Sequence, residues 1–252
     1  MGGIARIFAA VGRTGIVMTK SIAYFPAVVI HSRSRADLFV QLYATGIRTL
    51  PVVTVVALFT GMILSLQVGL ELSRFNQEMF LGAAVMLTMI REMAPFSCGL
   101  CLASMVGSAI AAELGTMKVN DEIDALVIMD IPPLRFLAAP RILALVLMAP
   151  LISFYCCIIG TVGGGLVGST QLNVDFGQYM SSAMSMAASK DLFVGVLKAL
   201  FFGLIIGTIS VAEGFGTKLG ATGVGKATQR SVILSFLSIL VFGYMITRMC
   251  YR

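Results

Sequence analysis

The stretch LPVVTVVALFTGMILSLQVGL, residues 50–70, contains no charged side chain and is apolar along its whole length. A helix needs about 20 predominantly apolar residues to cross the roughly 30 Å hydrocarbon core of a bilayer. This stretch has both the length and the composition. We therefore predict a membrane-spanning helix over Leu50–Leu70.

The composition of the whole chain agrees with a membrane protein. Of the 252 residues, 58% are hydrophobic and only 12% are charged, and the mean hydropathy is +0.96. Soluble domains carry about a quarter charged residues. The net charge of +6 then indicates anionic lipid headgroups as the partner rather than nucleic acid.

Four further apolar stretches predict four further crossings. The second is long and contains Arg91 and Glu92, and the fourth contains Lys198. The predicted fold is an all-α membrane protein with about five transmembrane helices. The four stretches are Phe80–Ala112, Ile142–Val167, Leu192–Val211 and Ser231–Thr247.

The basic residues predict the orientation. If the N-terminus is cytoplasmic, twelve Lys and Arg residues lie in inner segments: Arg6, Arg13, Lys20, Arg33, Arg35, Arg48, Lys118, Arg135, Arg141, Lys218, Lys226 and Arg230. Four lie in outer segments: Arg74, Lys190, Arg248 and Arg252. This distribution follows the positive-inside rule, and five crossings then place the C-terminus outside.

The first region, residues 1–49, is predicted to be separate from the transmembrane domain, residues 50–252. Arg6, Arg13 and Lys20 are seven residues apart, which places them on one stripe of a helix. Apolar residues fill much of the remaining circumference. We expect an amphipathic helix that lies on the membrane surface, and the alternative is a helix packed on another domain.

Arg91, Glu92 and Pro95 form the first polar region inside the apolar pattern, near the predicted outer boundary of the membrane. Proline lacks an amide hydrogen and disturbs a helix. Charges at membrane depth usually face a partner or a wet cavity. Two interpretations stay open: the charges face a partner or a wet cavity, or they simply lie in the outer headgroup layer.

The second polar region runs from Glu113 to Arg141, between the second and third predicted crossings. Asn120 is a good N-cap, and the helix that we expect after it has acidic residues in its first turn, where the helix dipole favours them. Its other side is apolar, and Pro132 and Pro133 end it. A short cytoplasmic helix of this kind can dock into a partner's groove. Its acidic residues are Asp121, Glu122 and Asp124.

The third region, Gly214–Arg230, contains GATGVGK at residues 220–226. This nearly fits the phosphate-binding loop motif, but Ala227 replaces the required Ser or Thr and no strand precedes it. We predict a flexible cytoplasmic loop without a nucleotide site. With the single histidine His31 outside the helices and no paired acids inside them, we expect no metal site and no enzyme activity.

Small residues recur every four positions in several of the predicted helices, among them the second and the third. This spacing lets helix backbones approach closely in lipid. The pattern does not say whether each stripe meets the same chain or a second copy. The residues are Gly107 and Ala111 in the second predicted crossing and Gly160, Gly164 and Gly168 in the third.

The segment AAELGTMKV at residues 111–119, continuing to Asp124, resembles the MlaE-type permeases, the membrane subunits of bacterial ABC transporters that work with MCE proteins. The resemblance extends from about Leu50 to Thr247. It includes Arg91, Glu92, Pro95, the Val106–Ala109 segment, Pro132, Pro140, Arg141, Asp191, Lys198 and the Gly223–Thr228 segment.

The resemblance implies a homodimer in the bacterial inner membrane, with two cytoplasmic ATPase subunits that hold ATP and Mg²⁺ and with an MCE protein outside. It also implies transport of glycerophospholipid or a related lipid. Within residues 113–131, the acidic helix near Asn120–Met129 then matches the coupling helix that seats in the ATPase, and Glu113, Gly115 and Thr116 come just before that helix. Arg91 and Glu92 match a charged pair at the outer mouth of a lipid cavity.

Two departures from the family pattern put the lipid preference in doubt. Ser104 and Met105 stand where the family usually has Gly-Arg, and Gly243 stands where an Asp is common. The alternative function is a lipid scramblase or secondary carrier without an ATPase. The scarcity of ionisable residues inside the helices disfavours ion coupling.

Overall fold

The structure is a computed structural model that describes residues 2–30, 32–218 and 220–251. Within these residues the chain is helical with short connections and has no strand, which confirms the all-α prediction. His31 and the predicted stripe of Arg6 and Arg13 side chains lie outside what the structure describes. The main helices are α1 (Gly2–Ile30), α2 (Ser32–Gly46), α3 (Leu50–Arg74), α4 (Leu81–Thr88), α5 (Ala94–Leu102), α6 (Ser108–Val119), α7 (Glu122–Ile128), α8 (Ala139–Gln171), α9 (Phe176–Ser185), α10 (Ser189–Phe215) and α11 (Gly220–Cys250).

Short helical segments of other geometry join several of these helices. Three are π-helical, a form that is rare and often marks functional sites. The π-helical segments are η3 (Met89–Met93), η4 (Ala103–Gly107) and η5 (Leu134–Ala138), and the 3₁₀ segments are η1 (Ile47–Thr49) and η2 (Glu78–Phe80).

Within the described residues, five continuous helical stretches are long and apolar enough to span a membrane. Each contains one of the five predicted crossings and extends beyond it, so the predicted set is confirmed and its boundaries were too narrow. The chain is therefore a multi-pass membrane protein. The stretches are Arg35–Arg74, Glu78–Val119, Leu134–Gln171, Ser189–Phe215 and Gly220–Cys250.

The chain forms two compact units. Unit 1 comprises residues 1–48, 102–148 and 201–240, and unit 2 comprises residues 49–101, 149–200 and 241–252. Several long helices contribute residues to both. The predicted division into residues 1–49 and 50–252 stays a prediction.

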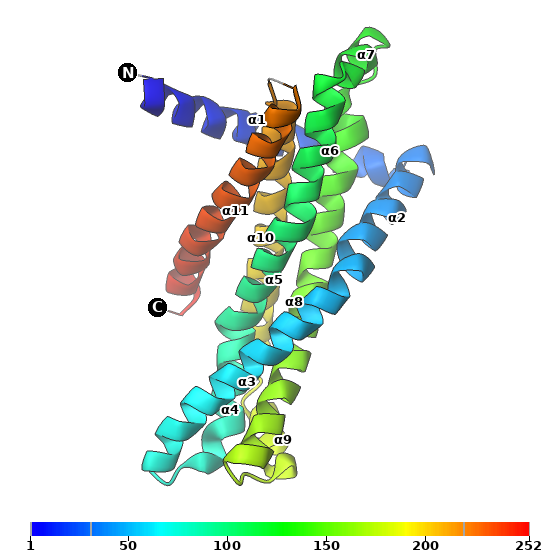
Figure 1. The fold of residues 1–252 in the computed structure, drawn as a ribbon. Coiled ribbons are helices and arrows are strands. Elements are labelled where there is room, and N and C mark those ends of the chain that lie inside the picture. Colours follow the sequence, from blue (N-terminus) through cyan, green and yellow to red (C-terminus); the bar gives the residue numbers. More distant parts are fainter. Residues whose placement is uncertain (1, 31, 219, 252) are drawn as a thin grey trace. The chain divides into compact units, whose positions relative to one another are not determined.

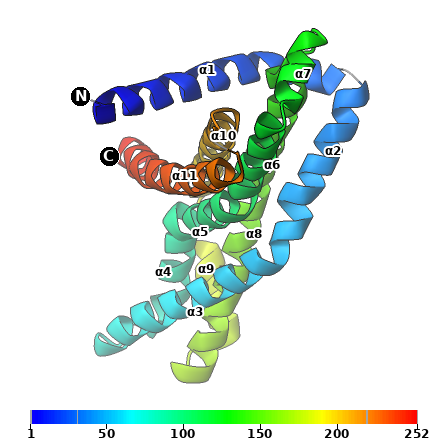
Figure 2. The same cartoon turned by 45° about the horizontal axis from the view of Figure 1, so that its top comes forward.

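In unit 1, α1 packs against α2 and the start of α8. Val28, Leu38 and Leu143 belong to a buried apolar cluster, with Tyr24 and Phe25 packed against it. Figure 2 shows α1 meeting α2 at a sharp corner. One side of α1 is thus covered by α2 and the start of α8 in the same unit. Whether its other side lies on a membrane stays a prediction.

The small-residue stripe of α6 and the segment before it also lies in unit 1, where it meets α10 of the same chain. A Cβ atom on Gly107 would lie 2.9 Å from the Ser210 hydroxyl oxygen. A Cβ atom on Gly214 would lie 3.3 Å from the Ala111 carbonyl oxygen. These backbones approach closely because neither glycine has a side chain.

In unit 2, α3 and α8 cross at a pair of glycines. A Cβ atom on Gly61 would lie only 1.8 Å from the Gly160 carbonyl oxygen, so no larger residue fits there. One turn further along, Ser65 donates a hydrogen bond of 2.8 Å to the Gly164 carbonyl oxygen. Gly168 lies against Leu81 and Tyr179. The predicted glycine stripe of α8 therefore contacts helices of its own chain.

Helix α9 closes one end of unit 2, where Figure 1 shows it with α3 and α4. Asp175 caps its first turn by accepting a 3.0 Å hydrogen bond from the Gln178 amide. The Tyr179 side chain is fully buried and its hydroxyl donates to the Thr161 carbonyl oxygen at 3.1 Å. Burial raises the pKa of Tyr179, so this hydroxyl keeps its proton and acts as a donor.

The prediction of a flexible loop over Gly214–Arg230 is wrong for most of that segment. Helix α10 continues to Phe215 and α11 begins at Gly220. Glycines weaken a helix in water by about 1 kcal/mol each, but packing decides here. Gly223 is buried, and a Cβ atom there would lie 1.6 Å from the Lys218 carbonyl oxygen. Gly223 and Ala227 begin the buried stripe of α11.

The predicted N-cap at Asn120 is also wrong. Asn120 is the C-cap of α6, and Asp121 takes the N-cap position of α7 in a left-handed conformation, with φ of 59°, without a capping side-chain bond. Asp and Asn tolerate this conformation better than most residues. It turns the chain directly from α6 into α7. The short acidic helix is present, with Glu122 and Asp124 in its first turn.

Candidate functional site

Pro95 shapes the backbone where the polar residues of the second span lie. An α-helix would bond the Arg91 carbonyl oxygen to the amide of residue 95, but proline has no amide hydrogen. The segment before it is the π-helix η3, which includes Arg91 and Glu92. The Lys198 ammonium donates to the Arg91 carbonyl oxygen at 2.6 Å. A buried lysine from α10 thus occupies the acceptor that the proline leaves without its usual partner.

Two ion pairs join η3 to α10. Arg91 donates two hydrogen bonds to the Asp191 carboxylate, of 2.8 and 3.0 Å, in a fork geometry. Lys198 donates to the Glu92 carboxylate at 2.7 Å. Asp191 and Lys198 are seven residues apart, which places them on the same face of α10.

Each pair has one accessible and one buried member. The side chain of Arg91 is 40% exposed and that of Asp191 is 4% exposed. In the second pair Glu92 is 41% exposed and Lys198 is 1% exposed. The buried members are Asp191 and Lys198. Removing the partner of either one would leave an uncompensated charge away from water, which is costly.

The last turns of α11 and the residue that follows it add two uncharged donors. Thr247 donates to the Glu92 carboxylate at 2.7 Å, and the Tyr251 hydroxyl donates to Asp191 at 2.8 Å. The Arg91 guanidinium lies over the Tyr251 ring, 4.6 Å from its centroid. Burial and the Asp191 carboxylate raise the pKa of Tyr251, so its hydroxyl stays a donor at neutral pH.

These six residues form one connected network, which we call the polar cluster: Arg91, Glu92, Asp191, Lys198, Thr247 and Tyr251. Two positive and two negative side chains balance its formal charge. The accessible guanidinium of Arg91 is the group in it that could bind an external anion such as a phosphate. No group of three potential metal ligands comes together in the described part of the chain.

The sequence pointed to Arg91, Glu92 and Pro95 but not to the other members as a site. Asp191 came only from the family resemblance, and Lys198 came from that resemblance and as a charge inside an apolar stretch. Their spacing of seven residues places them on one helical face. Thr247 and Tyr251 are four residues apart, which is the same kind of signal. Neither pattern says which distant helix the side chains meet.

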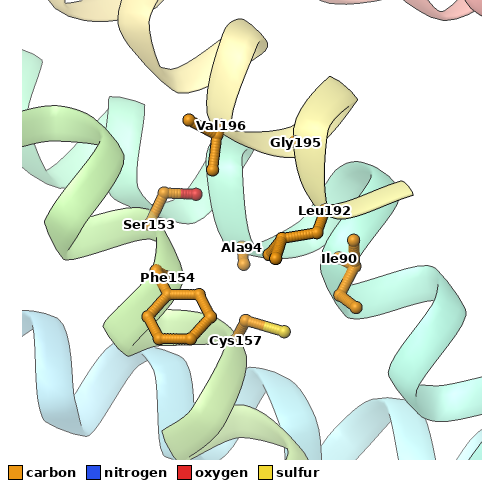
Figure 3. Close-up of a pocket in the computed structure, with 8 residues that line it drawn as sticks. All are labelled: Ile90, Ala94, Ser153, Phe154, Cys157, Leu192, Gly195 and Val196. Carbon is orange, nitrogen blue, oxygen red and sulfur yellow. The ribbon is translucent and has the colours of Figure 1, made fainter. Parts of the chain in front are cut away.

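A small, partly open pocket lies beside the polar cluster in unit 2, between the η3–α5 segment, α8 and α10, with room for about one water molecule. Figure 3 shows its lining, which is apolar except for the Ser153 hydroxyl and the Cys157 thiol. Ile90 and Leu192 line it and are direct neighbours of Arg91 and Asp191 in the chain. The other lining residues are Ala94, Phe154, Gly195 and Val196.

The predicted coupling residues lie in unit 1, around the turn from α6 into α7, which stands at the end of α6 in Figure 2. The buried Arg141 side chain donates to Glu113 at 2.7 Å and to the Leu137 carbonyl oxygen at 2.7 Å, which ties α6 to the start of α8. Lys118 donates twice to Asp124, at 2.7 and 2.8 Å.

The remaining predicted coupling residues divide into packed and exposed ones. Gly115 is buried, and a Cβ atom there would lie 2.9 Å from the Thr217 hydroxyl oxygen. Thr116, Asp121 and Glu122 are exposed. The end of α7 exposes an apolar tip formed by Val127, Ile128 and Met129.

Comparison with known proteins gives one consistent result. The family model described as permease MlaE matches residues 38–249. A probable ABC transporter permease protein of Rickettsia typhi is 35% identical over 250 residues, which is 96% of each chain. The intermembrane phospholipid transport system permease protein MlaE of Haemophilus influenzae is 33% identical over 95% of this chain and 91% of its own. The chloroplast protein TRIGALACTOSYLDIACYLGLYCEROL 1 of Arabidopsis thaliana is 30% identical over 82% of this chain and 59% of its own.

Proposed function

The chain belongs to the MlaE permease family, and from this premise we propose that it is the membrane subunit of an ABC transporter that moves phospholipid between membranes. The similarity to the Haemophilus phospholipid permease over nearly the whole length of both chains carries this proposal. The proposed assembly is a dimer of this chain in the bacterial inner membrane, with a cytoplasmic ATPase dimer and an extracytoplasmic MCE protein.

The ATPase is proposed to bind α7. The apolar tip of α7 is exposed, and Ile128 is 85% accessible although it is a large apolar residue. Acidic residues lie in the first turn of the same helix. An exposed short helix with an apolar tip suits a groove on a partner. The Arg141–Glu113 pair then links α6 and α8 rigidly behind the docked helix.

In this assembly α7 and the N-terminus lie in the cytoplasm, and the polar cluster and the C-terminus lie on the periplasmic side. The exposed side of α1 lies on the inner surface of the membrane. ATP and Mg²⁺ bind to the ATPase, and this chain needs no cofactor and catalyses no reaction of its own.

The polar cluster is proposed to receive the lipid headgroup. A phosphodiester carries one negative charge, and the Arg91 guanidinium, although its Nε and Nη2 donate to Asp191, is 40% exposed and can attract it. Glu92 is the accessible carboxylate of the cluster and suits a cationic headgroup amine. ATP-driven movement of α7 and its neighbours would then change the access of lipid to this end of the helices.

The test uses the tagged chain purified in mild detergent with its native partners. Mass spectrometry of bound proteins and lipids is expected to find an ATPase, an MCE protein and phospholipid. Ile128→Asp is expected to lose the ATPase by more than about tenfold, because a charge replaces an apolar contact. Phe75→Asp is the matched control, since Phe75 is 73% exposed and lies at the end of α3.

Two results would contradict the proposal. If the wild-type chain purifies without any ATPase under conditions that preserve a control complex, the chain acts as a scramblase or secondary carrier. If Ile128→Asp keeps the ATPase as well as Phe75→Asp does, α7 is not the docking helix.

A further inference from the structure

The hydroxyl of Ser235 is buried in α11 without a hydrogen-bond partner among the described residues. The residue is 0% exposed, and its side-chain oxygen makes no hydrogen bond. A buried hydroxyl without a partner is costly, and a serine in a helix can avoid that cost by donating to the carbonyl four residues earlier. Thr247 of the same helix does so, to the Gly243 carbonyl oxygen. Ser235 does not, so its burial requires an explanation beyond packing.

A partner for this hydroxyl lies one helical turn away in the same unit. Ser231 donates to the Ser210 hydroxyl of α10 at 2.9 Å, and Ser210 donates to the Ile206 carbonyl oxygen at 2.7 Å. Ser231 and Ser235 both belong to the buried stripe of α11 and are four residues apart, so they share one face of the helix. A displacement of α11 by four residues, about 6 Å along its axis with a rotation of about 40°, would bring Ser235 to the place of Ser231.

The same spacing recurs at the other end of α11, in unit 2. Thr247 donates to the Glu92 carboxylate and Tyr251 donates to the Asp191 carboxylate, and these two donors are also four residues apart. The same displacement would bring Tyr251 to the place of Thr247, next to Glu92. Because α11 is continuous from Gly220 to Cys250, both ends would move together.

Helix α11 is held by little protein. Only 11% of its spanning window is buried in the chain, against 28–61% in the other four spanning stretches. Its exposed sides are apolar through the middle of the helix, with Phe236, Leu240 and Val241 among the exposed residues. Lipid would therefore surround α11 equally well in either position. Near its start, Lys226 and Arg230 are exposed, and the displacement would carry both charges toward water in the proposed orientation.

We propose that α11 has two positions that differ by one helical turn, and that its movement transmits the action of the ATPase to the polar cluster. In the observed position Ser231 bonds Ser210. In the second position α11 has moved toward its N-terminal end and Ser235 bonds Ser210 instead. One-turn shifts of packed helices are known as switching elements. The inference rests on the proposed function, because the ATPase supplies the energy for the movement.

The movement changes the polar cluster. In the second position Tyr251 leaves Asp191 for Glu92, and the Thr247 hydroxyl keeps the Gly243 carbonyl oxygen of its own helix. Asp191 then keeps the ion pair with Arg91 and loses its uncharged donor. The second position has one hydrogen bond fewer to the cluster, so the observed position is favoured without ATP. ATP binding selects the second position and loosens the ion pair for exchange with lipid.

The test is disulfide crosslinking in two double variants, Ser210→Cys with Ser231→Cys and Ser210→Cys with Ser235→Cys. Cysteine is close to serine in shape, and a disulfide requires Cα atoms about 4.4–6.8 Å apart. The complex with its ATPase is reconstituted in vesicles and oxidised briefly with copper phenanthroline, once without nucleotide and once with a non-hydrolysable ATP analogue. Peptide mass spectrometry identifies which positions are joined, so the native cysteines do not confuse the result.

Without nucleotide we expect positions 210 and 231 to crosslink at least about tenfold faster than positions 210 and 235, because the second pair needs a shift of about 6 Å. The ATP analogue should reverse this order. The inference is overturned if the order is the same in both conditions. That result would mean that α11 is fixed and that a trapped water satisfies Ser235.

Ser235→Ala supplies a second readout. It removes a hydroxyl that has no partner in the observed position, so the unfolding midpoint should stay unchanged or rise. ATP-dependent lipid transfer should nevertheless fall by about fivefold, because the second position loses its bond to Ser210. The matched control is Ser238→Ala, which lies on the same helix outside the buried stripe and should transfer lipid as the wild type does.

Equal transfer by Ser235→Ala and Ser238→Ala would also overturn the inference. Failure of the proposed function gives a different result, since the wild type would then show no ATP-dependent transfer at all. If the wild type transfers lipid while the order of crosslinking never changes, the proposed function stands and the movement of α11 is refuted.

Discussion

Because Lys198 is buried and Glu92 is accessible, the loss of stability should depend on which of the two is removed. In Glu92→Met, the ammonium of Lys198 keeps only the Arg91 carbonyl oxygen as an acceptor, while its side chain stays 1% exposed. Removing one partner of a buried ion pair costs about 3–5 kcal/mol. Because Glu92 itself is 41% exposed, we expect a value near the lower end, about 3 kcal/mol.

The reverse substitution leaves a milder defect. In Lys198→Met the Glu92 carboxylate remains accessible and keeps the Thr247 donor. The main loss is the donor to the Arg91 carbonyl oxygen, which is about 1–2 kcal/mol. The double variant leaves neither member of this pair without its partner, so it should resemble Lys198→Met. The coupling energy between the two residues should then equal the cost of Glu92→Met, about 3 kcal/mol.

The assay is the midpoint of thermal unfolding of the purified chain in one detergent, followed by gel filtration of the remaining folded protein. For chains of 150–250 residues, 1 kcal/mol shifts the midpoint by about 2–4 °C. We expect a fall of about 6–12 °C for Glu92→Met and roughly half of that for Lys198→Met and for the double variant. Unfolding of this kind is often irreversible, so the order of the variants is the result that counts.

The reasoning is refuted if Lys198→Met is as unstable as Glu92→Met, or if the double variant shows the sum of both losses. Either outcome would mean that the ammonium of Lys198 finds water or another acceptor when Glu92 is removed. The burial asymmetry of the pair would then have no energetic consequence.

Two further variants test the packing and the donors of unit 2. Gly61→Ala should lower the unfolding midpoint, because its Cβ would lie 1.8 Å from the Gly160 carbonyl oxygen. The control is Gly12→Ala, which has nothing within 4 Å of the added Cβ and should leave the midpoint unchanged or raise it slightly. Equal midpoints for the two variants would contradict the contact between α3 and α8. Tyr251 has a pKa above its usual value, so its contribution should be constant up to about pH 10 and be lost above it. The midpoint of the wild type should therefore fall more steeply above pH 10 than that of Tyr251→Phe, and parallel curves would show that the hydroxyl does not stabilise the fold.

The crossings could be predicted from the sequence because a run such as Leu50–Leu70 has no other stable environment. The ends of the helices could not be predicted in this way, because a helix can continue beyond its apolar run. Helix α11, for example, begins at Gly220, before the predicted crossing at Ser231. The error at Gly214–Arg230 has the same origin. Glycine signals a loop when only local propensity acts, but a backbone contact such as that of Gly223 with Lys218 makes glycine a packing residue.

The candidate site was half visible in the sequence for a related reason. Arg91 and Glu92 could be recognised as charges in an apolar stretch, and Pro95 predicted a disturbed helix. The partners lie about 100 residues further along, at Asp191 and Lys198, and only the fold selects which helix faces η3.

In one ion pair the acid is buried and in the other the base is buried. This difference determines which accessible member, Arg91 or Glu92, can leave its internal partner and bind a lipid. If a phosphate took the Arg91 guanidinium, Asp191 would remain 4% exposed with the Tyr251 hydroxyl as its donor, which makes the exchange costly. If a headgroup amine took Glu92, Lys198 would keep the Arg91 carbonyl oxygen that Pro95 leaves without a backbone donor. The second exchange leaves more of the network satisfied. A lipid that bound both Arg91 and Glu92 would take the ionic partners of Asp191 and Lys198 at the same time. The uncharged donors Thr247 and Tyr251 hold Glu92 and Asp191 in the cluster when no lipid is bound. They therefore help to determine how readily the two ion pairs separate.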